Sequence, residues 1–248
     1  MIPLRTEADL QVLRKSGKIL SKVMSEIRKA VAPGIATREI DALAEKITLK
    51  EGATCAFKGY KGYPASVCIS INEEVVHGIP GERIIQSGDI VSLDLGINYK
   101  GFFTDAAVTL AAGKIDTKKQ KLIDTTRLAL FEGIKEARPG NHLLDISYGI
   151  QTCAERNGFS VVRQFVGHGI GKSLHEEPEV PNFGQPHMGP VLKSGMVLAI
   201  EPMINMGTWE AEILDNGWTA VTRDRLPSAH FEHTVAIRDD GPEILTGN

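Results

Sequence analysis

The sequence has few of the features that mark secreted, membrane-spanning or nucleic-acid-binding proteins. Its three cysteines, Cys55, Cys68 and Cys153, are an odd number without metal-type spacing, which favours reduced thiols in a cytosol-like compartment. No apolar run approaches the roughly 18 residues that a membrane span requires, and the amphipathic N-terminus holds no signal-peptide core. The formal net charge of −3 is mixed along the chain, so neither nucleic acid nor an anionic membrane is the expected partner.

The chain also lacks low-complexity segments and linkers, so we expect a single domain spanning residues 1–248. Apolar residues recur at helical spacing in two pairs of segments, and a Pro-Gly dipeptide separates the members of each pair. The expected helices are 7–31, about 14 residues ending near Gly52, 118–138, and 143–157 ending at Gly158. Pro33 precedes Gly52 by nineteen residues, the spacing that also separates Pro139 from Gly158.

The expected strands repeat as well. SGDIVSLDLG at 87–96 aligns with SGMVLAIEPM at 194–203, matching Asp94 to Glu201, and TDAAVTL at 104–110 aligns with FEHTVAI at 231–237, matching Asp105 to Glu232. Because identity is low, chance alignment is the alternative to a duplication. A duplication with halves of about 1–112 and 113–248 predicts an α+β fold with a pseudo-two-fold axis, a central antiparallel sheet and outer helices.

A hairpin is expected between the first two acidic strands. NYKG is a plausible tight turn, and placing Asn98 opposite Gly101 sets Asp94 opposite Asp105 on one face. The other face would then pair Val91 with Val108, Leu93 with Ala106, and Ile97 with Phe102. Two carboxylates this close require a cation, or one of them must take up a proton. Solvent-facing positions on an ordinary sheet are the alternative.

The four acids and a histidine indicate a metal site. If a two-fold axis relates the halves, Glu201 and Glu232 join the first pair in a dry core, where a cation offsets their repulsion and desolvation. His168, flanked by glycines that permit close approach of a ligand, is the candidate fifth ligand for Mn, Fe or Co. We interpret the remaining histidines as structural on their own, and His233 is expected on the opposite strand face; this set comprises His77, His142, His175, His187, His230 and His233.

Seven motifs, in order along nearly the whole chain, resemble the type I methionine aminopeptidase family of M24 metallopeptidases, which has the pita-bread fold. They are HGIP at 77–80, LDLG at 93–96, TDAA at 104–107, GHGIG at 167–171, LHEEP at 174–178, EPM at 201–203 and FEHT at 231–234. GYKGYPASVCISINE at 59–73 is similar to the methionine-removing branch. Short spacings after His168 and Glu201 leave no room for the type II insertion, so we expect a bacterial-type short form.

The resemblance implies two divalent metal ions, with cobalt, manganese, iron, zinc or nickel as options. Asp94 would hold one ion, His168 and Glu201 the other, and Asp105 and Glu232 both. It also implies that Glu201 accepts a proton from the attacking water, and that His77 and His175 stabilise the tetrahedral intermediate. The implied substrate pocket comprises Phe57, Tyr60, Tyr63, Cys68, His77, Leu174, His175 and Trp218.

Two pocket positions depart from the pattern expected of some bacterial members, and so does a third position outside the pocket. Phe57 stands in place of a cysteine, Leu174 in place of phenylalanine, and Gly96 in place of a threonine beside a monovalent cation. The first two keep the pocket apolar, so we expect a changed pocket shape without a changed substrate class. The glycine at position 96 leaves the presence of the auxiliary cation site open.

The expected function is removal of the initiator methionine from nascent chains when the second residue is small. The resemblance implies a cytoplasmic monomer that works near the ribosome. An Xaa-Pro-type pita-bread peptidase is one alternative, although such enzymes usually carry a further N-terminal domain. A non-catalytic pita-bread binding protein is the other, although such relatives usually lack metal ligands, whereas the five expected ligands are present here.

Overall fold

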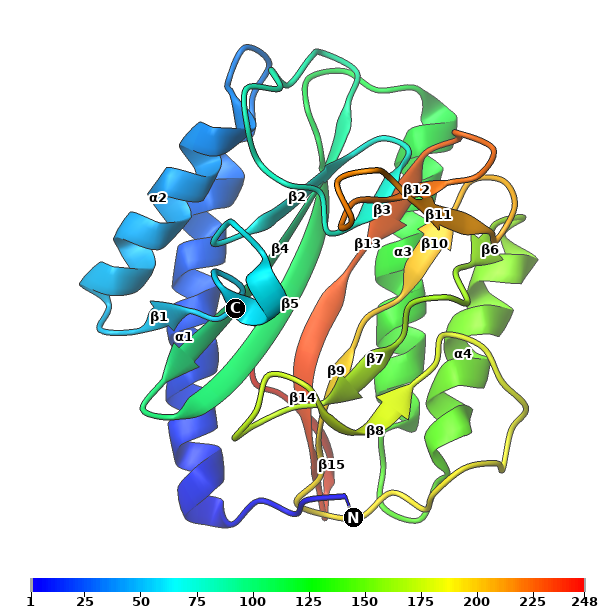
Figure 1. Cartoon of the computed structure of the whole chain (residues 1–248). Coiled ribbons are helices and arrows are strands. Elements are labelled where there is room, and N and C mark those ends of the chain that lie inside the picture. Colours follow the sequence, from blue (N-terminus) through cyan, green and yellow to red (C-terminus); the bar gives the residue numbers. More distant parts are fainter. Residues whose placement is uncertain (1, 248) are drawn as a thin grey trace.

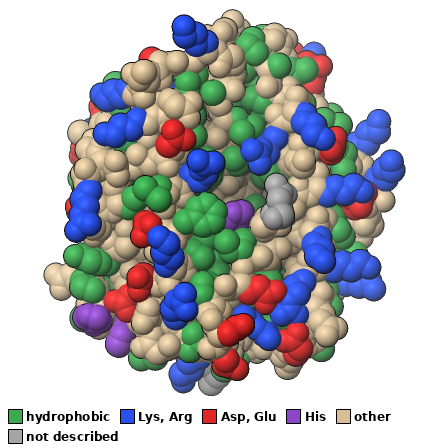
Figure 2. Space-filling view, turned by 180° about the vertical axis from the view of Figure 1, so that it is seen from behind, with side chains coloured by type: hydrophobic (Ala, Val, Ile, Leu, Met, Phe, Trp, Pro, Cys, Tyr) green, Lys and Arg blue, Asp and Glu red, His purple; other side chains and the backbone are tan. Residues whose placement is uncertain are grey.

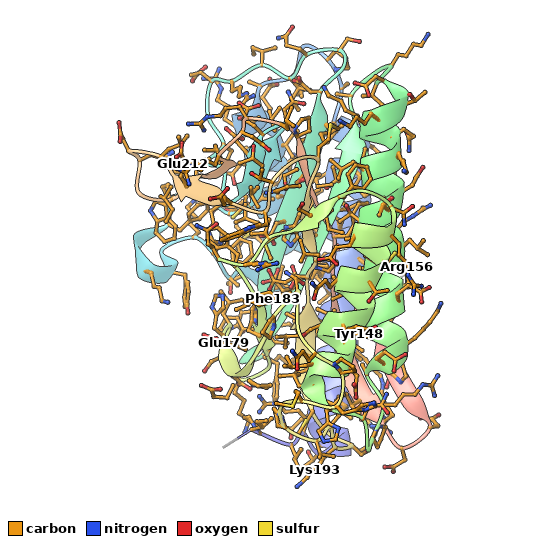
Figure 3. All side chains as sticks on the ribbon, turned by 90° about the vertical axis from the view of Figure 1, so that its right-hand side faces the viewer. Tyr148, Arg156, Glu179, Phe183, Lys193 and Glu212 are labelled. Carbon is orange, nitrogen blue, oxygen red and sulfur yellow. The ribbon has the colours of Figure 1, made fainter. Side chains whose placement is uncertain are left out.

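Four α-helices lie behind a curved antiparallel sheet in the computed structural model, which describes residues 2–247 (Figure 1). The helices are α1 (Glu7–Ala30), α2 (Thr37–Lys50), α3 (Thr117–Glu136) and α4 (Leu143–Arg156). All four expected helices are confirmed. Seen from the side in Figure 3, the helices form one layer, and the strands and loops that carry Glu179 and Glu212 form the opposite side. None of these helices, within the described residues, is both long and apolar enough to span a membrane.

Helix α1 forms because its sequence supplies an N-terminal cap and one apolar face that packs on the sheet. Thr6 caps the first turn by accepting from the Asp9 backbone N–H at 3.2 Å, while the Asp9 carboxylate accepts from the Thr6 backbone N–H. The apolar positions that predicted the helix face the sheet, and five of them are buried: Leu10, Leu13, Leu20, Met24 and Ile27.

The large sheet has nine strands, with β1-β4-β5-β14-β9-β7-β8 as its main path, β2 paired to β4, and β15 paired to β14. Its strands are β1 (Thr54–Cys55), β2 (Cys68–Ile71), β4 (Ile90–Tyr99), β5 (Phe102–Ala111), β7 (Gly167–Gly169), β8 (Glu176–Val180), β9 (Val197–Ile200), β14 (Glu232–Arg238) and β15 (Gly241–Ile244). Two three-stranded sheets flank it, built from β3 (Glu74–Val76), β6 (Ser160–Val161), β10 (Met203–Asn205), β11 (Ala211–Ile213), β12 (Ala220–Thr222) and β13 (Ser228–His230).

The hairpin joining β4 to β5 exists, but its predicted register was wrong by two residues. Tyr99 pairs with Phe102, so Asp94 lies opposite Ala107 and Asp105 lies opposite Gly96. The pairs expected on the other face shift in the same way. Val91 pairs with Leu110, Leu93 with Val108, and Ile97 with Thr104. Because side chains alternate along a strand, a shift of two keeps Asp94 and Asp105 on one face, as diagonal neighbours.

Each half of the chain packs its own helix pair on its own strands. In the first half, Ile27 of α1 and Ile40 of α2 share a core with Leu93 of β4. In the second, Ile134 of α3 shares another core with Leu198 of β9. The halves meet where β5 pairs with β14 in the middle of the sheet. This arrangement agrees with a duplication, which stays a prediction.

The contact between α1 and the C-terminal strand region predicts a steric requirement at Gly17. A Cβ atom at this position would lie 2.0 Å from the Leu245 carbonyl oxygen. We expect Gly17→Ala to destabilise the fold by about 1–3 kcal/mol from overpacking, which outweighs a helix-propensity gain of about 1 kcal/mol. Chemical denaturation measures the difference. Gly149→Ala, whose Cβ would lie 3.2 Å from Glu132 O, is the matched control with a smaller effect; a Gly17→Ala protein more stable than wild type would contradict the packing.

Candidate metal centre

Strand register brings four of the expected ligands to one face of the sheet. Ala107 pairs with Asp94 on one side and with Glu232 on the other, so both acids point the same way as Asp105, two residues from Ala107. On the far side of β14, Ala199 of β9 pairs with His168 of β7. Glu201 follows two residues later, just past the end of β9.

This face is turned away from the helices. His233 alternates with Glu232 on β14, and its ring lies 6.0 Å from the Phe131 ring of α3. The expectation that His233 points to the opposite face from Glu232 is therefore confirmed. Its Nδ1 atom bonds the Thr246 hydroxyl at 2.9 Å, on the helix side.

The glycines beside His168 serve a purpose beyond the one expected. A Cβ atom on Gly167 would lie 2.3 Å from the Ala199 carbonyl oxygen, and one on Gly169 would lie 2.2 Å from the Glu177 carbonyl oxygen. The glycines thus let neighbouring backbone approach β7, a reason for them that the sequence did not predict, while the expectation that they permit close approach of a ligand to His168 stays a prediction. His168 Nδ1 lies 2.9 Å from the Gly169 carbonyl oxygen, so an Nδ1–H donor there leaves Nε2 free to bind a metal.

The donor atoms fit a metal ion. Ligand atoms of Asp105, His168 and Glu232 lie within 4.8 Å of one another, and all three residues are buried. Among residues 2–247, two buried oxygens of the group have no hydrogen-bond partner, Asp94 Oδ1 and Glu232 Oε1. A cation supplies the missing partner that such buried oxygens require.

Electrostatics lead to the same requirement. Burial raises the pKa of Asp94, Glu201 and Glu232 well above the usual carboxylate range, and neighbouring acids raise it further. The pKa of Asp105 rises to about 7, chiefly through burial. Burial lowers the pKa of His168 to about 4, so its imidazole is neutral near pH 7 and suited to a metal. The acids cannot all ionise here unless a cation offsets their charge.

His230 is a member of this site that the sequence analysis treated as an ordinary structural histidine. Its Nε2 atom is buried, lies 3.7 Å from Glu201 Oε2, and has no hydrogen-bond partner within the described residues. On the other side of Glu201, His168 Nε2 lies 3.4 Å from Oε1. Glu201 is therefore held between two imidazoles. The position of His230 before the FEHT motif gave no periodic signal that would have identified it.

An apolar cavity of about 300 Å³ opens beside these ligands. Every residue expected to bind metal or substrate lines it: Phe57, Tyr60, Tyr63, Cys68, His77, Asp94, Asp105, His168, Leu174, His175, Glu201, Trp218 and Glu232. Their individual roles stay predictions. Sequence reasoning missed other lining residues, including Val76, Met203 and Phe165; the Phe165 ring meets His77 edge-on at 5.6 Å.

Two of the residues that depart from the family pattern, Gly96 and Phe57, are in contact. A Cβ atom on Gly96 would lie 2.7 Å from Cε1 of Phe57 and 3.3 Å from Oδ2 of Asp105. The phenylalanine ring thus occupies the space that a side chain at position 96 needs. The small residue on β4 and the large residue before the Tyr60–Gly62 turn are complementary.

His175 is oriented by contacts on both sides of its ring. Its Nδ1 atom lies 2.9 Å from the Tyr60 hydroxyl, and the two rings stack at 5.2 Å. The His168 ring lies 4.2 Å away on the metal side. Burial lowers the pKa of His175 to about 3, so the ring is neutral near pH 7.

A buried ion pair that the sequence analysis missed fixes the loop that carries His175. Arg5 Nη2 donates to Glu176 Oε2, and Glu176 Oε1 accepts from the backbone N–H groups of Lys172 and Ser173 at 2.8 and 2.9 Å. The guanidinium lies against Gly171, where a Cβ atom would come within 2.5 Å of it. The N-terminal segment therefore holds the 171–176 loop in place.

Comparison with known proteins gives consistent matches. The model of metallopeptidase family M24 matches residues 11–239. The chain is 53% identical to a methionine aminopeptidase of Clostridium perfringens, over 99% of both chains. It is also similar to a crystal structure of methionine aminopeptidase from Thermotoga maritima, with a TM-score of 0.98, 44% identity and full coverage of both chains. A prolidase from Pyrococcus furiosus shares the fold at 23% identity and a TM-score of 0.81, and 65% of that chain is covered.

The crowded acids predict an unusual pH dependence of the metal-free protein. A carboxyl whose pKa is raised by folding contributes stability that is complete below the unfolded pKa, near 4. That contribution is lost as pH rises through the folded pKa, about 7 for Asp105. In chelator, we expect the melting temperature of wild type relative to Asp105→Asn to fall between about pH 5 and pH 8. Added Mn²⁺ at pH 8 should restore the melting temperature of the wild-type protein. Parallel profiles of melting temperature against pH for the two proteins would contradict the raised pKa of Asp105.

The Arg5–Glu176 pair predicts local mobility when it is broken. Removing one partner of a buried ion pair costs about 3–5 kcal/mol, so in Arg5→Gln the unpaired Glu176 should move toward water. Hydrogen exchange of the Lys172 and Ser173 amides should then quicken. Arg14→Gln is the control, because Arg14 bonds Glu243 far from the loop. Equal exchange of the loop in both variants would mean that Arg5 does not position it.

Proposed function

The chain belongs to metallopeptidase family M24 and, within it, to the methionine aminopeptidases; from that premise we propose which residues carry the reaction and which substrate the cavity selects. The substrate is the N-terminal methionine of nascent polypeptides whose second residue is small. The observation that supports this most directly is the convergence of five potential metal ligands, drawn from both halves of the chain, beside an apolar cavity.

We propose that Asp94, Asp105, His168, Glu201 and Glu232 hold two divalent ions. This donor set is supported by the buried oxygens of Asp94 and Glu232 that lack a hydrogen-bond partner among the described residues, and by the neutral His168 ring. Carboxylates together with one imidazole suit manganese, iron or cobalt. Bound divalent metal would supply Lewis-acid activation of water and of the scissile carbonyl. Asp94, Asp105 and Glu232 lie on a continuous sheet, so their carboxylates are fixed before substrate arrives.

Glu201 is the proposed proton acceptor. Its carboxylate faces the cavity with 13% of the side chain exposed, and imidazoles flank both of its oxygens. Removal from water raises its proton affinity, which favours acceptance of a proton from the attacking water. His168 and His230 restrict the rotation of the Glu201 side chain, so the accepting oxygen keeps one direction.

His175 and His77 are proposed to bind the reacting amide. If the Tyr60 hydroxyl donates to His175 Nδ1, then Nε2 carries the proton and can donate to the oxygen of the tetrahedral intermediate. Burial lowers the pKa of His77, so it also presents a neutral ring. Phe165 packs against the edge of His77 and directs that ring toward the cavity.

The remaining cavity wall suits a methionine side chain. Phe57, Tyr63 and Trp218 supply apolar rings, and the buried Cys68 thiol adds a polarisable contact for a thioether. Tyr63 donates its hydroxyl proton to the Gly78 carbonyl at 2.9 Å, which leaves only its ring face for the ligand. An unbranched side chain fits such a slot with little loss of polar contacts. We further propose that the enzyme meets its substrates in the cytosol, near the ribosome.

The proposed substrate preference can be tested with two tripeptides. We expect chelator-stripped protein supplied with Mn²⁺, Fe²⁺ or Co²⁺ to release methionine from Met-Ala-Ser on the order of 10²-fold faster than from Met-Leu-Ser, because a fixed site cannot adjust to a larger second residue. Free methionine is quantified by chromatography, and Glu201→Gln is the inactive control. Cleavage of Gly-Pro without cleavage of Met-Ala-Ser would show that the pocket is assigned wrongly.

A further inference from the structure

A second group of metal-ligating side chains lies on the helix side of the molecule. His142 and Asp145 belong to the start of α4, and His187 belongs to the segment that joins β8 to β9. Their potential ligand atoms all lie within 4.8 Å of one another. Histidine side chains also gather at the lower left of Figure 2, which views the molecule from behind. Figure 3 labels Tyr148 of the same helix, which lines a cavity together with Asp145 and His187.

Backbone hydrogen bonds bring the segments of this group together. The first free N–H groups of α4, those of Leu143 and Leu144, donate to the carbonyl oxygens of Pro190 and Met188 at 2.9 and 3.1 Å. His142 itself forms an antiparallel bridge with Val191. The segment and the helix start are therefore held together, and the two histidine backbones have fixed positions.

Asp145 is the buried centre of the group. Its Oδ2 atom accepts from the backbone N–H of His142 and its Oδ1 atom from that of His187, both at 2.7 Å. Burial acts to raise the pKa of Asp145, but these two bonds leave it below the usual value, so the side chain is ionised near pH 7. Each oxygen retains a second lone pair for another partner.

Helix capping explains Asp145 but does not explain why two imidazoles converge on it. His187 Nδ1 lies 3.7 Å from Asp145 Oδ1, although 83% of the His187 side chain is exposed and could extend into water. Neither ring forms a side-chain hydrogen bond within the described residues, so their nitrogens are available. The sequence interpretation of both as ordinary structural histidines therefore leaves their shared position without a cause.

We propose that His142, Asp145 and His187 bind a divalent ion of the zinc type, with solvent as the fourth ligand. Two imidazoles and one carboxylate form a ligand set that zinc uses with an open position. Bond lengths of about 2.0–2.2 Å place tetrahedral ligand atoms about 3.4 Å apart. The His187 and Asp145 ligand atoms are 3.7 Å apart and those of all three residues lie within 4.8 Å of one another, so side-chain rotation must draw them together around the ion. Glu132 and Glu136 line the same cavity and bring two carboxylates to it, one of them paired with a lysine.

Such an ion would link the β8–β9 segment to α4 and act on stability rather than on the reaction. The segment also carries Asn182, whose Nδ2 atom donates to the Glu201 carbonyl oxygen at 3.1 Å. Residue 182 is close to the candidate metal centre and residue 187 is at the new site, so the link would anchor one end of this connection. Binding to the folded protein alone raises its melting temperature.

The test is zinc content and thermal stability of the full chain. Chelator-stripped wild type and variants are dialysed against one buffered free Zn²⁺ concentration, and zinc per chain is measured by atomic absorption. We expect wild type to hold one more zinc ion per chain than His187→Asn or His142→Gln. Asparagine suits the positive φ of 63° at position 187, so that variant should fold as wild type does. The zinc-dependent rise in melting temperature should shrink in both variants.

The control is Glu132→Gln/Glu136→Gln, which removes two charges from the same cavity but no proposed ligand. It should keep the additional zinc, which separates coordination from general attraction of cations. In chelator all variants should melt near wild type, showing that the histidines matter only when zinc is present. Equal zinc content in wild type and both histidine variants would overturn the proposal, and so would loss of the additional zinc in the glutamate control.

Discussion

The structure depends on the pairing of β5 with β14. Within the large sheet, this antiparallel pairing joins the two halves of the chain and places Asp105 and Glu232 in the middle of the sheet. Because alternate side chains point to opposite faces, a slip of β14 by one residue against β5 would turn Glu232 toward the helices. Those helices present apolar side chains there, so a slipped register would bury charge without a partner. The register is therefore specified by the core as much as by the site.

A fold that concentrates acids at its centre needs stability from elsewhere. Each helix pair supplies a separate apolar core on the helix side of the sheet, and these cores do not involve the ligands. The strands stay aligned even though their other face carries mutually repelling carboxylates. The apolar cores thus support the strands that carry most of the proposed donors, and rigid strands hold such side chains more precisely than loops do.

The sequence predicted the helices well because their periodicity and stops are local. It predicted that Asp94 and Asp105 share a face, but it placed the turn one residue too early, which shifts the pairing of the two strands by two residues. Lys100 and Gly101 form the turn, both with positive φ, a geometry in which the first position usually holds asparagine. The turn was predicted to begin at Asn98 because asparagine favours turns. In the structure Asn98 belongs to β4, and its side-chain oxygen accepts from the Gly101 N–H at 3.0 Å.

The features that the sequence could not predict are contacts between distant segments with no periodic pattern. Arg5 and Glu176 are separated by 171 positions, and their pairing follows from where the N-terminal segment crosses the sheet. His187 likewise reaches Asp145 only because the segment after β8 folds back onto the start of α4. A histidine in a Pro-His-Met-Gly stretch has no local reason to bind metal. Its chemistry is set by the carboxylate that the fold places beside it, so ligand groups of this kind become visible only when the backbone path is known.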